Sequence, residues 1–147
     1  MIKKTAAGLF LAAAMMGASA SSLAASPAET LAAFHGALVA GDRDKATRML
    51  APDIAIYESG HVERSRDEYA GHHLGGDMEF AKNTTRKVLK QNERIDGDTA
   101  VVWQETETTG TLRGKAIHML GTETAVLRKK DGAWSIVHVH WSSRKAK

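Results

Sequence analysis

Alternation of apolar and polar residues is most regular near the C-terminus of this 147-residue chain. Segment 134–142 is rich in β-branched and aromatic residues and follows Asp131-Gly132, a dipeptide typical of tight hairpin turns. The pattern predicts a strand. Because side chains alternate along a strand, one face is expected to carry Trp134, Ile136, His138 and His140, and the other Val137, Val139 and Trp141. Both faces hold large apolar groups, so we expect both to be covered.

The same alternation predicts three further strands just upstream, at about residues 86–94, 99–109 and 115–129. Tight turns at Asp96-Gly97, Arg113-Gly114 and Asp131-Gly132 join these strands to one another and to the last one. Strands joined in this way form an antiparallel meander. An earlier strand at 53–58 ends at Ser59-Gly60 and sets Glu58 on the face opposite to Tyr57.

Helical spacing dominates the beginning of the chain. Ser26-Pro27-Ala28-Glu29 has the pattern of a capping box, and apolar residues then recur at helical intervals until Gly41. A second short helix is predicted from about Asp42 until Pro52 closes it. A third is predicted from Ser65 to about His73, with a break at Gly75-Gly76. The predicted class is α+β, with the helices gathered on one face of a curved sheet.

Residues 1–25 have the pattern of a secretory signal peptide. A basic head at Lys3 and Lys4 precedes an apolar run to about Ala18 and small residues that offer cleavage after Ala20, Ala24 or Ala25. The apolar run is too short to span a bilayer. We therefore expect export to a bacterial periplasm, no membrane attachment after cleavage, and a single domain over residues 26–147.

Composition narrows the classes of function. Loss of Lys3 and Lys4 leaves 18 basic groups against 17 acidic ones, so the high pI is weak support for a nucleic-acid partner, and none is expected. The chain has no cysteine, which excludes disulfides, thiol catalysis and thiolate metal sites. Neither a glycine-rich phosphate loop nor a Gly-x-Ser-x-Gly motif occurs, and no cofactor is expected.

The turns set a strand register and, with it, a candidate pocket. If Asp131 and Gly132 form a two-residue turn, Ala125 lies opposite His138 and Glu123 opposite His140. The same count from Arg113-Gly114 places Gln104 opposite Glu123, so that Gln104, Glu123 and His140 form a row across three strands. A slip of one residue would move Glu123 to the other face. That other face collects Val101, Trp103, Val139 and Trp141, a surface suited to a partner subunit.

The candidate catalytic pair is His140 oriented by Glu123, because a carboxylate fixes the tautomer of a neighbouring imidazole and raises its basicity. Such a pair can act as general acid or base on a carbonyl-containing ligand. The candidate ligand-binding residues are His138, Gln104, Tyr57, Glu58 and one of His72 and His73. Adjacent residues on a helix point about 100° apart, so His72 and His73 cannot both face one pocket.

Other interpretations of the same residues stay open. His138, His140 and Glu123 can instead form a satisfied buried network that fixes the register. His138-x-His140 with a carboxylate across the ladder can also hold zinc or copper. The apolar face can serve assembly alone, in a non-catalytic dimer. His35, beside the apolar stripe of the first helix, is predicted to be a half-exposed helix residue and not a ligand.

The order of elements resembles that of a known family. A capped helix at Ser26, a short helix over 41–50, the Pro52-Asp53-Ile54 segment and the ending 132–142 are similar to SnoaL-like members of the nuclear-transport-factor-two-like superfamily. The ending is also similar to the association domain of calcium/calmodulin-dependent kinase. The resemblance implies a cone in which a strongly curved antiparallel sheet wraps around helices and a pocket, and a homodimer with the sheets back to back.

The resemblance also implies a range of activities. The superfamily includes ketosteroid-isomerase-like and polyketide-cyclase enzymes, dehydratases and binding modules without catalysis. The isomerase pattern needs a tyrosine and a neutral aspartic acid as oxyanion donors and a second aspartate as base. Only Tyr57 maps onto that pattern here, so small-molecule binding, with isomerase, cyclase or dehydratase chemistry as its catalytic extension, is the expected function.

Overall fold

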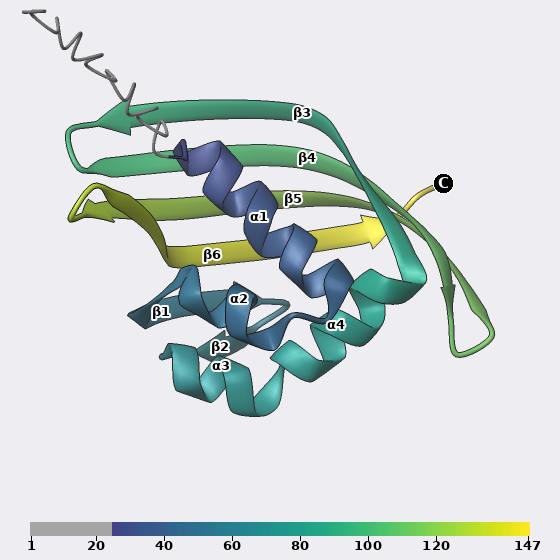
Figure 1. Cartoon of the computed structure of the whole chain (residues 1–147). Coiled ribbons are helices and arrows are strands. Elements are labelled where there is room, and N and C mark those ends of the chain that lie inside the picture. The colour runs from purple at the N-terminus through teal and green to yellow at the C-terminus, as the bar shows by residue number, and fades with distance from the viewer. Residues whose placement is uncertain (1–24) are drawn as a thin grey trace, which may run out of the picture.

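The computed structural model describes residues 25–147, and six strands and four helices are found there. The elements in chain order are α1 (Pro27–Ala40), α2 (Arg43–Arg48), β1 (Leu50–Glu58), β2 (His61–Glu63), α3 (Arg66–His72), α4 (Leu74–Asn83), β3 (Thr84–Asp96), β4 (Thr99–Leu112), β5 (Lys115–Lys130) and β6 (Ala133–Lys145). The strands form one sheet in the order β2-β1-β6-β5-β4-β3, which curls without closing. Figure 1 shows α1 lying across the concave side of this sheet, with α2, α3 and α4 beside it. The predicted α+β class is confirmed.

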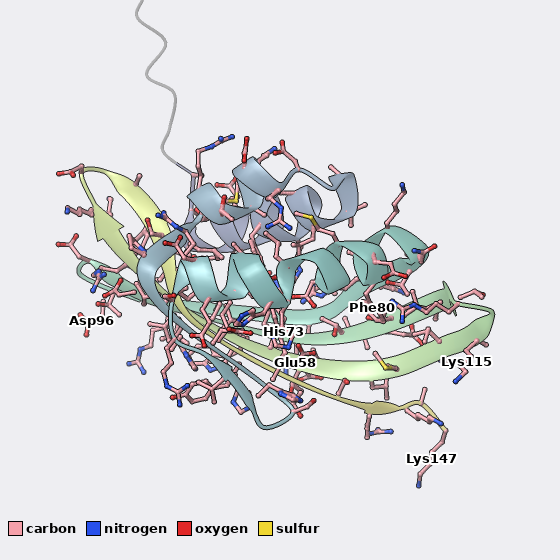
Figure 2. The ribbon with its side chains drawn as sticks, turned by 90° about the horizontal axis from the view of Figure 1, so that it is seen from below. Glu58, His73, Phe80, Asp96, Lys115 and Lys147 are labelled. Carbon is pink, nitrogen blue, oxygen red and sulfur yellow. The ribbon has the colours of Figure 1, made fainter. Side chains whose placement is uncertain are left out.

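Apart from Ala25, the predicted signal peptide lies outside the described residues. Among residues 25–147, none of the helices has the length and apolar content needed to cross a membrane. Figure 2, turned by 90°, shows the helices stacked over one side of the sheet, while the other, convex side is free of helices in the described part of the chain.

Helix α1 begins and ends as its sequence predicts. The Ser26 hydroxyl accepts a hydrogen bond from the Glu29 backbone N–H at 3.1 Å, and the Glu29 carboxylate accepts one from the Ser26 N–H at 2.7 Å. Gly41 ends the helix with φ 68°, a left-handed conformation that costs glycine little. Leu31, Phe34 and Leu38 point into the core at 0–4 % exposure. The cap contributes about 1 kcal/mol and fixes where this apolar face begins.

The break predicted at Gly75-Gly76 is wrong. The chain turns at His73 and continues as α4, which contains both glycines. Leu74 is fully buried, and Met78 and Ala81 pack against the core at helical spacing. Burial of these side chains outweighs a penalty of about 1 kcal/mol for each glycine in a helix. Helix α4 brings Asp77 to the concave side of the sheet.

Strand β1 also differs from its prediction. Helix α2 ends at Arg48, so Pro52 does not close it but lies inside β1. The β1–β6 pairing shifts between Leu50 and Ala55, and a proline is tolerated at such an irregularity because it has no N–H to donate. β1 pairs with β6 in parallel, so the sheet is mixed, whereas the four strands β3 to β6 form the predicted antiparallel meander. The face assignment of β1 holds: Ile56 is buried and Tyr57 is 45 % exposed.

A β-bulge at Val137 changes the register of the last strand pair. Near the turn Lys130 pairs with Ala133, as predicted, and Leu127 pairs with Ile136. The next pair is Val126 with His138, which leaves Val137 as an extra residue. One extra residue flips every side chain beyond it to the other face. From His138 to the end of β6, each residue therefore pairs with a different residue of β5 than predicted.

The displaced pairs overturn the predicted row. Glu123 lies opposite Trp141 and Ala125 opposite Val139, so the predicted pairings with His140 and His138 are wrong. Pairing between β4 and β5 has no such shift, and the predicted pairing of Gln104 with Glu123 is confirmed. His138 and His140 therefore turn to the convex side, and Val139 and Trp141 to the concave side.

The core fills the space between the concave side and the helices. Its fully buried side chains from the sheet include Ile54, Val102, Leu127, Ile136 and Val139. Val139 at 0 % exposure and Trp141, which packs against the core, cannot form an outward surface with Val101 and Trp103, as the sequence had predicted. Of that predicted surface, Val101 and Trp103 alone remain on the convex side.

Candidate functional site

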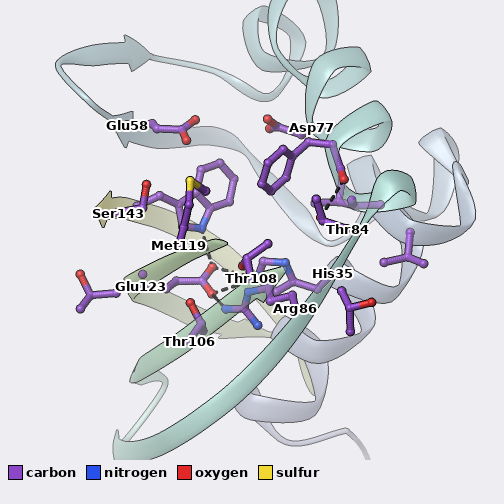
Figure 3. Close-up of a pocket in the computed structure, with 18 of the residues that line it drawn as sticks. His35, Glu58, Asp77, Thr84, Arg86, Thr106, Thr108, Met119, Glu123 and Ser143 are labelled. Atoms are coloured by element: carbon purple, nitrogen blue, oxygen red, sulfur yellow. Dashed lines mark hydrogen bonds and ion pairs between the residues drawn. The ribbon is translucent and has the colours of Figure 1, made fainter. Parts of the chain in front are cut away.

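A hollow of about 490 Å³ lies between α1, α4 and the concave side of β3 to β6. Its apolar lining comes from α1, α4, β5 and β6 and includes Leu38, Val39, Phe80, Met119 and Trp141. Polar side chains enter it at two places, one on the sheet around Glu123 and one at Glu58 and Asp77 (Figure 3). An apolar hollow with a few convergent polar groups is the usual form of a small-molecule site.

On the sheet side, Glu123 is 3 % exposed and accepts hydrogen bonds from three side chains on three different elements. Arg86 Nη2 on β3 donates at 2.6 Å, and Trp141 Nε1 on β6 donates at 2.7 Å. His35 Nε2 on α1 lies 2.9 and 3.0 Å from the two carboxylate oxygens. Because an ionised carboxylate only accepts, this contact requires the proton on His35 Nε2. Figure 3 shows His35 and Arg86 beside the Glu123 carboxylate.

Hydrogen bonds extend from this cluster along the sheet. Arg86 Nη2 also donates to Gln104 Oε1 at 2.5 Å, and Gln104 Nε2 donates to Gln91 Oε1 at 2.6 Å. Gln104 is 4 % exposed and lies behind Arg86 instead of on the wall of the hollow. The network holds the guanidinium from two sides.

The donors around Glu123 decide its charge. Burial by itself would raise the pKa of this carboxyl, but His35, Arg86 and the Trp141 indole together hold the pKa below its usual range. Glu123 is therefore ionised at neutral pH and paired with the Arg86 guanidinium. Such a carboxylate orients its neighbours and is a poor proton carrier near neutrality.

At the second polar place the carboxyl pKa values are raised, in contrast to that of Glu123. Burial raises the pKa of Asp77, although the Tyr69 hydroxyl donates to its Oδ2 at 2.7 Å and the nearby His73 and His35 act in the lowering direction. Burial also raises the pKa of Glu58, and the charge of Asp77 raises it further. In Figure 3 the two carboxyl groups lie on the same side of the hollow, away from Glu123. Their raised pKa values suit them to gain and lose protons closer to neutral pH.

The tyrosine beside Asp77 stays a donor. Tyr69 is fully buried, and burial, followed by the charge of Asp77, raises the pKa of its phenol far above the usual range. The phenol is therefore protonated at neutral pH and donates its hydrogen to Asp77.

The two histidines of the last strand lie away from the hollow. His138 Nδ1 is 2.9 Å from the Ala55 carbonyl oxygen, and its ring meets the Tyr57 ring edge-on at 5.0 Å between centroids. His140 is exposed, with its ring 6.3 Å from that of Tyr57. The predicted contact of His140 with Glu123 is wrong, because the Val137 bulge puts them on opposite sides of the sheet. For the same reason His138-x-His140 lacks the carboxylate ligand of the predicted metal site.

The other predicted site residues are divided between places. Glu58 lines the hollow, whereas Tyr57 points to the convex side. His72 and His73 end α3 and lie against Glu63, with His72 66 % and His73 44 % exposed in their side chains. Figure 2 shows His73 near Glu58, between the helices and the sheet. Of the nominated residues, the structure brings Glu58 and Glu123 to one cavity and ties Gln104 to it through Arg86.

Three residues of the hollow escaped the sequence reasoning. His35 follows Phe34 at the margin of the apolar face of α1, and this position was a usable signal for a residue at the rim of the core. Arg86 occupies an inward position of β3, opposite the buried Thr108, and could have been found by alternation. Asp77 gave no signal, because its helix was not predicted.

Comparison with known proteins agrees with this geometry. A family model described as "SnoaL-like domain" matches residues 28–144. A search of the curated proteins found no match. A solved structure from Shewanella frigidimarina, assigned as a ketosteroid isomerase, is 39 % identical with a TM-score of 0.74, and the alignment covers 77 % of this chain and 91 % of that one.

Two association-domain structures are also similar. One from Xanthomonas campestris, assigned as a calcium/calmodulin-dependent protein kinase II association domain, is 27 % identical with a TM-score of 0.64 and coverage of 82 % and 93 %. The association domain of Caenorhabditis elegans CaMKII is 23 % identical with a TM-score of 0.63 and coverage of 78 % and 91 %, a likeness of fold. With the family match running from α1 to the end of β6, the chain belongs to the SnoaL-like domain family and has the nuclear-transport-factor-two-like fold.

Proposed function

We propose that the protein binds a small, largely apolar ketone in the hollow and moves a proton on it, with Asp77 as the base. One observation carries the proposal: Asp77 and Glu58 face a mostly apolar cavity with raised pKa values, while Glu123 at its other end is held ionised. The assigned isomerase of Shewanella frigidimarina supports the same class of chemistry.

The proposed reaction uses one acid in its ionised form and the other in its protonated form. Asp77 in its ionised form takes a proton from the carbon next to the ligand carbonyl, the C–H bond breaks, and the electron pair moves toward the carbonyl oxygen. Glu58 in its protonated form donates to that oxygen, which stabilises the developing charge. Return of the proton from Asp77 to another carbon gives an isomer. The Tyr69 hydroxyl orients the Asp77 carboxylate and keeps part of its population ionised.

The histidine that contacts Glu123 is not the predicted one. The sequence predicted a histidine oriented by Glu123, and the histidine found beside Glu123 is His35 instead of His140. Because His35 Nε2 donates to Glu123, the imidazole braces α1 against the sheet. The catalytic assignment therefore moves from His140 and Glu123 to Asp77 and Glu58.

The test uses a series of β,γ-unsaturated cyclic ketones, from single rings to steroid-sized molecules. Deuterium uptake at the α-carbon in deuterated water is followed by NMR, and formation of the conjugated enone by absorbance. The Asp77→Asn variant is expected to lose at least about a hundredfold in rate, the usual contribution of a general base. Asp53→Asn is the matched control, since Asp53 is exposed and pairs with Arg128. Equal rates in wild type and Asp77→Asn would contradict the proposal.

We also propose that the protein is exported, as its N-terminal pattern predicts. A further proposed property is assembly. The convex side exposes 45 % of Tyr57 on β1 and 41 % of Trp103 on β4, where Val101 and its cross-strand partner Val126 are half-buried. Association-domain structures share the fold. We propose a homodimer through this surface. Light scattering at micromolar concentration is expected to give twice the chain mass, and a monomer would contradict it.

A further inference from the structure

A buried carboxylate beneath α3 lacks a hydrogen bond on one oxygen. Glu63, the last residue of β2, is 5 % exposed. Its Oε1 accepts from His73 Nδ1, but its Oε2 has no hydrogen-bond partner in the part of the chain that the structure describes. An unmatched buried carboxylate oxygen is costly, and such groups are typically paired or coordinate a metal.

Two further side chains with ligand atoms lie near that carboxylate. His72 Nδ1 lies 3.5 Å from Glu63 Oε2, too far for a good hydrogen bond. Glu68 precedes His72 by four residues on α3, so both project from one face of the helix. Ligand atoms of Glu63, Glu68 and His72 all lie within 4.8 Å of one another. Bonds of about 2.0–2.2 Å to one ion require ligand atoms less than about 4.4 Å apart, so the side chains of Glu68 and the exposed His72 draw closer when an ion binds.

The cluster is held in place by its surroundings. The N-terminal cap of α3, in which the Ser65 hydroxyl accepts from the Glu68 N–H at 3.0 Å, fixes the first turn of the helix. Glu68 Oε2 accepts from the Arg64 N–H at 2.6 Å, which leaves its other oxygen uncommitted by that bond. His73 holds Glu63 Oε1, so that Oε2 is presented to His72.

We propose that Glu63, Glu68 and His72 bind a divalent transition-metal cation of the zinc type. One imidazole and two carboxylates, with no thiolate, form a donor set suited to zinc, which takes three protein ligands and a water at open sites. The metal supplies the missing partner of Glu63 Oε2 and joins the end of β2 to the helix α3. Its ligands differ from His138-x-His140 and from Asp77 and Glu58, the acids of the proposed proton transfer.

The test is isothermal titration of the metal-free protein with Zn²⁺ alone. Wild type is expected to bind one ion per chain, and His72→Ala, which changes an exposed side chain and spares the core, to lose at least tenfold in affinity. Glu68→Gln, which can still accept from the Arg64 N–H, is expected to lose affinity while its melting temperature without metal stays unchanged. His118→Ala is the matched control, because His118 is an exposed histidine that contacts a glutamate, Glu107, on another part of the sheet.

The outcomes separate clearly. Loss of affinity in His72→Ala and Glu68→Gln with full affinity in His118→Ala supports the site. No binding by wild type at micromolar Zn²⁺ overturns it. Unchanged affinity and stoichiometry in His72→Ala also overturn it, and a loss confined to His138→Ala would place the metal on the convex side.

Discussion

Glu123 and Asp77 are both largely buried acids that face one cavity, yet their pKa values move in opposite directions. Glu123 receives hydrogen bonds from a guanidinium, an imidazole and an indole, whereas Asp77 receives one from the Tyr69 phenol. Burial alone raises both. The number and charge of the donors decide the sign of the shift, so the same enclosure holds one fixed charge and one group able to exchange a proton.

Topology explains the difference in donors. Glu123 lies on β5, and the uninterrupted pairing of β4 with β5 sets Gln104 opposite it. Arg86 reaches it from β3, whose pairing with β4 shifts between Val88 and Lys90. Asp77 lies in the first turn of α4. Its side-chain donor among the described residues is the Tyr69 hydroxyl, which comes from the neighbouring helix α3. A sheet surrounds its residues with neighbours on both sides, and a helix at the margin does not.

The largest expected effect comes from neutralising the fixed charge. Glu123→Gln should lower the free energy of unfolding at neutral pH by about 3–5 kcal/mol, because it leaves the Arg86 guanidinium in the cluster without its counter-charge. The folded pKa of Glu123 is depressed, so its contribution is present above the unfolded pKa and is lost as pH falls through the folded pKa. The gap between wild type and variant in urea denaturation should therefore narrow in acid.

Glu105→Gln is the control for that measurement. Glu105 is an exposed acid 3.9 Å from Lys90, and exposed pairs contribute about 0–1 kcal/mol. If Glu123→Gln lowers the free energy of unfolding no more than Glu105→Gln does, Glu123 is not the fixed, stabilising charge that sets it apart from Asp77.

An intermediate effect is expected from removing the single donor of Asp77. Tyr69→Phe should lower the free energy of unfolding by about 1.5–3 kcal/mol at neutral pH, the usual contribution of a hydrogen bond to a charged group. It should also raise the pKa of Asp77 further, since the phenol bond acts in the lowering direction. A carbon-13 NMR titration of the Asp77 carboxyl measures that shift. Tyr57→Phe on the convex side is the control, and an unchanged titration in Tyr69→Phe would argue against the assigned bond.

The smallest expected effect is a gain in stability. Glu58→Gln should raise the melting temperature at mildly alkaline pH by about 2–4 °C, because the amide mimics the protonated acid that burial favours. The folded pKa is raised, so the wild-type protein loses stability as pH rises through that pKa, and the gain should vanish in acid, where both states are protonated. Scanning calorimetry across pH tests this.

Glu79→Gln serves as its reference. Glu79 is solvent-exposed and its pKa is lowered by hydrogen bonding to Arg113, so the substitution should give no gain at alkaline pH. A fall in melting temperature for Glu58→Gln above neutral pH would show that the ionised form of Glu58 is required by the fold.

Local patterns were sufficient for much of the architecture. The capping box at Ser26, the left-handed turns at Arg113-Gly114 and Asp131-Gly132, and the alternation of β4 and β5 each depend on residues close together in the chain. Because β4 and β5 pair from their turn without interruption, the contact of Gln104 with Glu123 followed by counting. The inward place of Glu123 was predictable for this reason.

The site as a whole was not predictable in this way. The Val137 bulge exchanges the two faces of β6, and a strand with large apolar residues on both faces gives no sign of such an exchange. Helix α4 forms across two glycines because Leu74 is buried and Met78 and Ala81 pack against the core. The proposed metal ligands likewise come from two elements, Glu63 from β2 and Glu68 and His72 from α3.

The sequence by itself determined most helices and strands, with β2 and α4 as the exceptions, and where most tight turns fall. Those choices rest on hydrogen bonds and side-chain periodicities spanning a few residues. Only the tertiary structure decided which histidine meets Glu123 and which acid remains poorly solvated. His35 and Glu123 are 88 positions apart, and their contact depends on how α1 packs across the sheet, while one extra residue in β6 turns His140 to the opposite side.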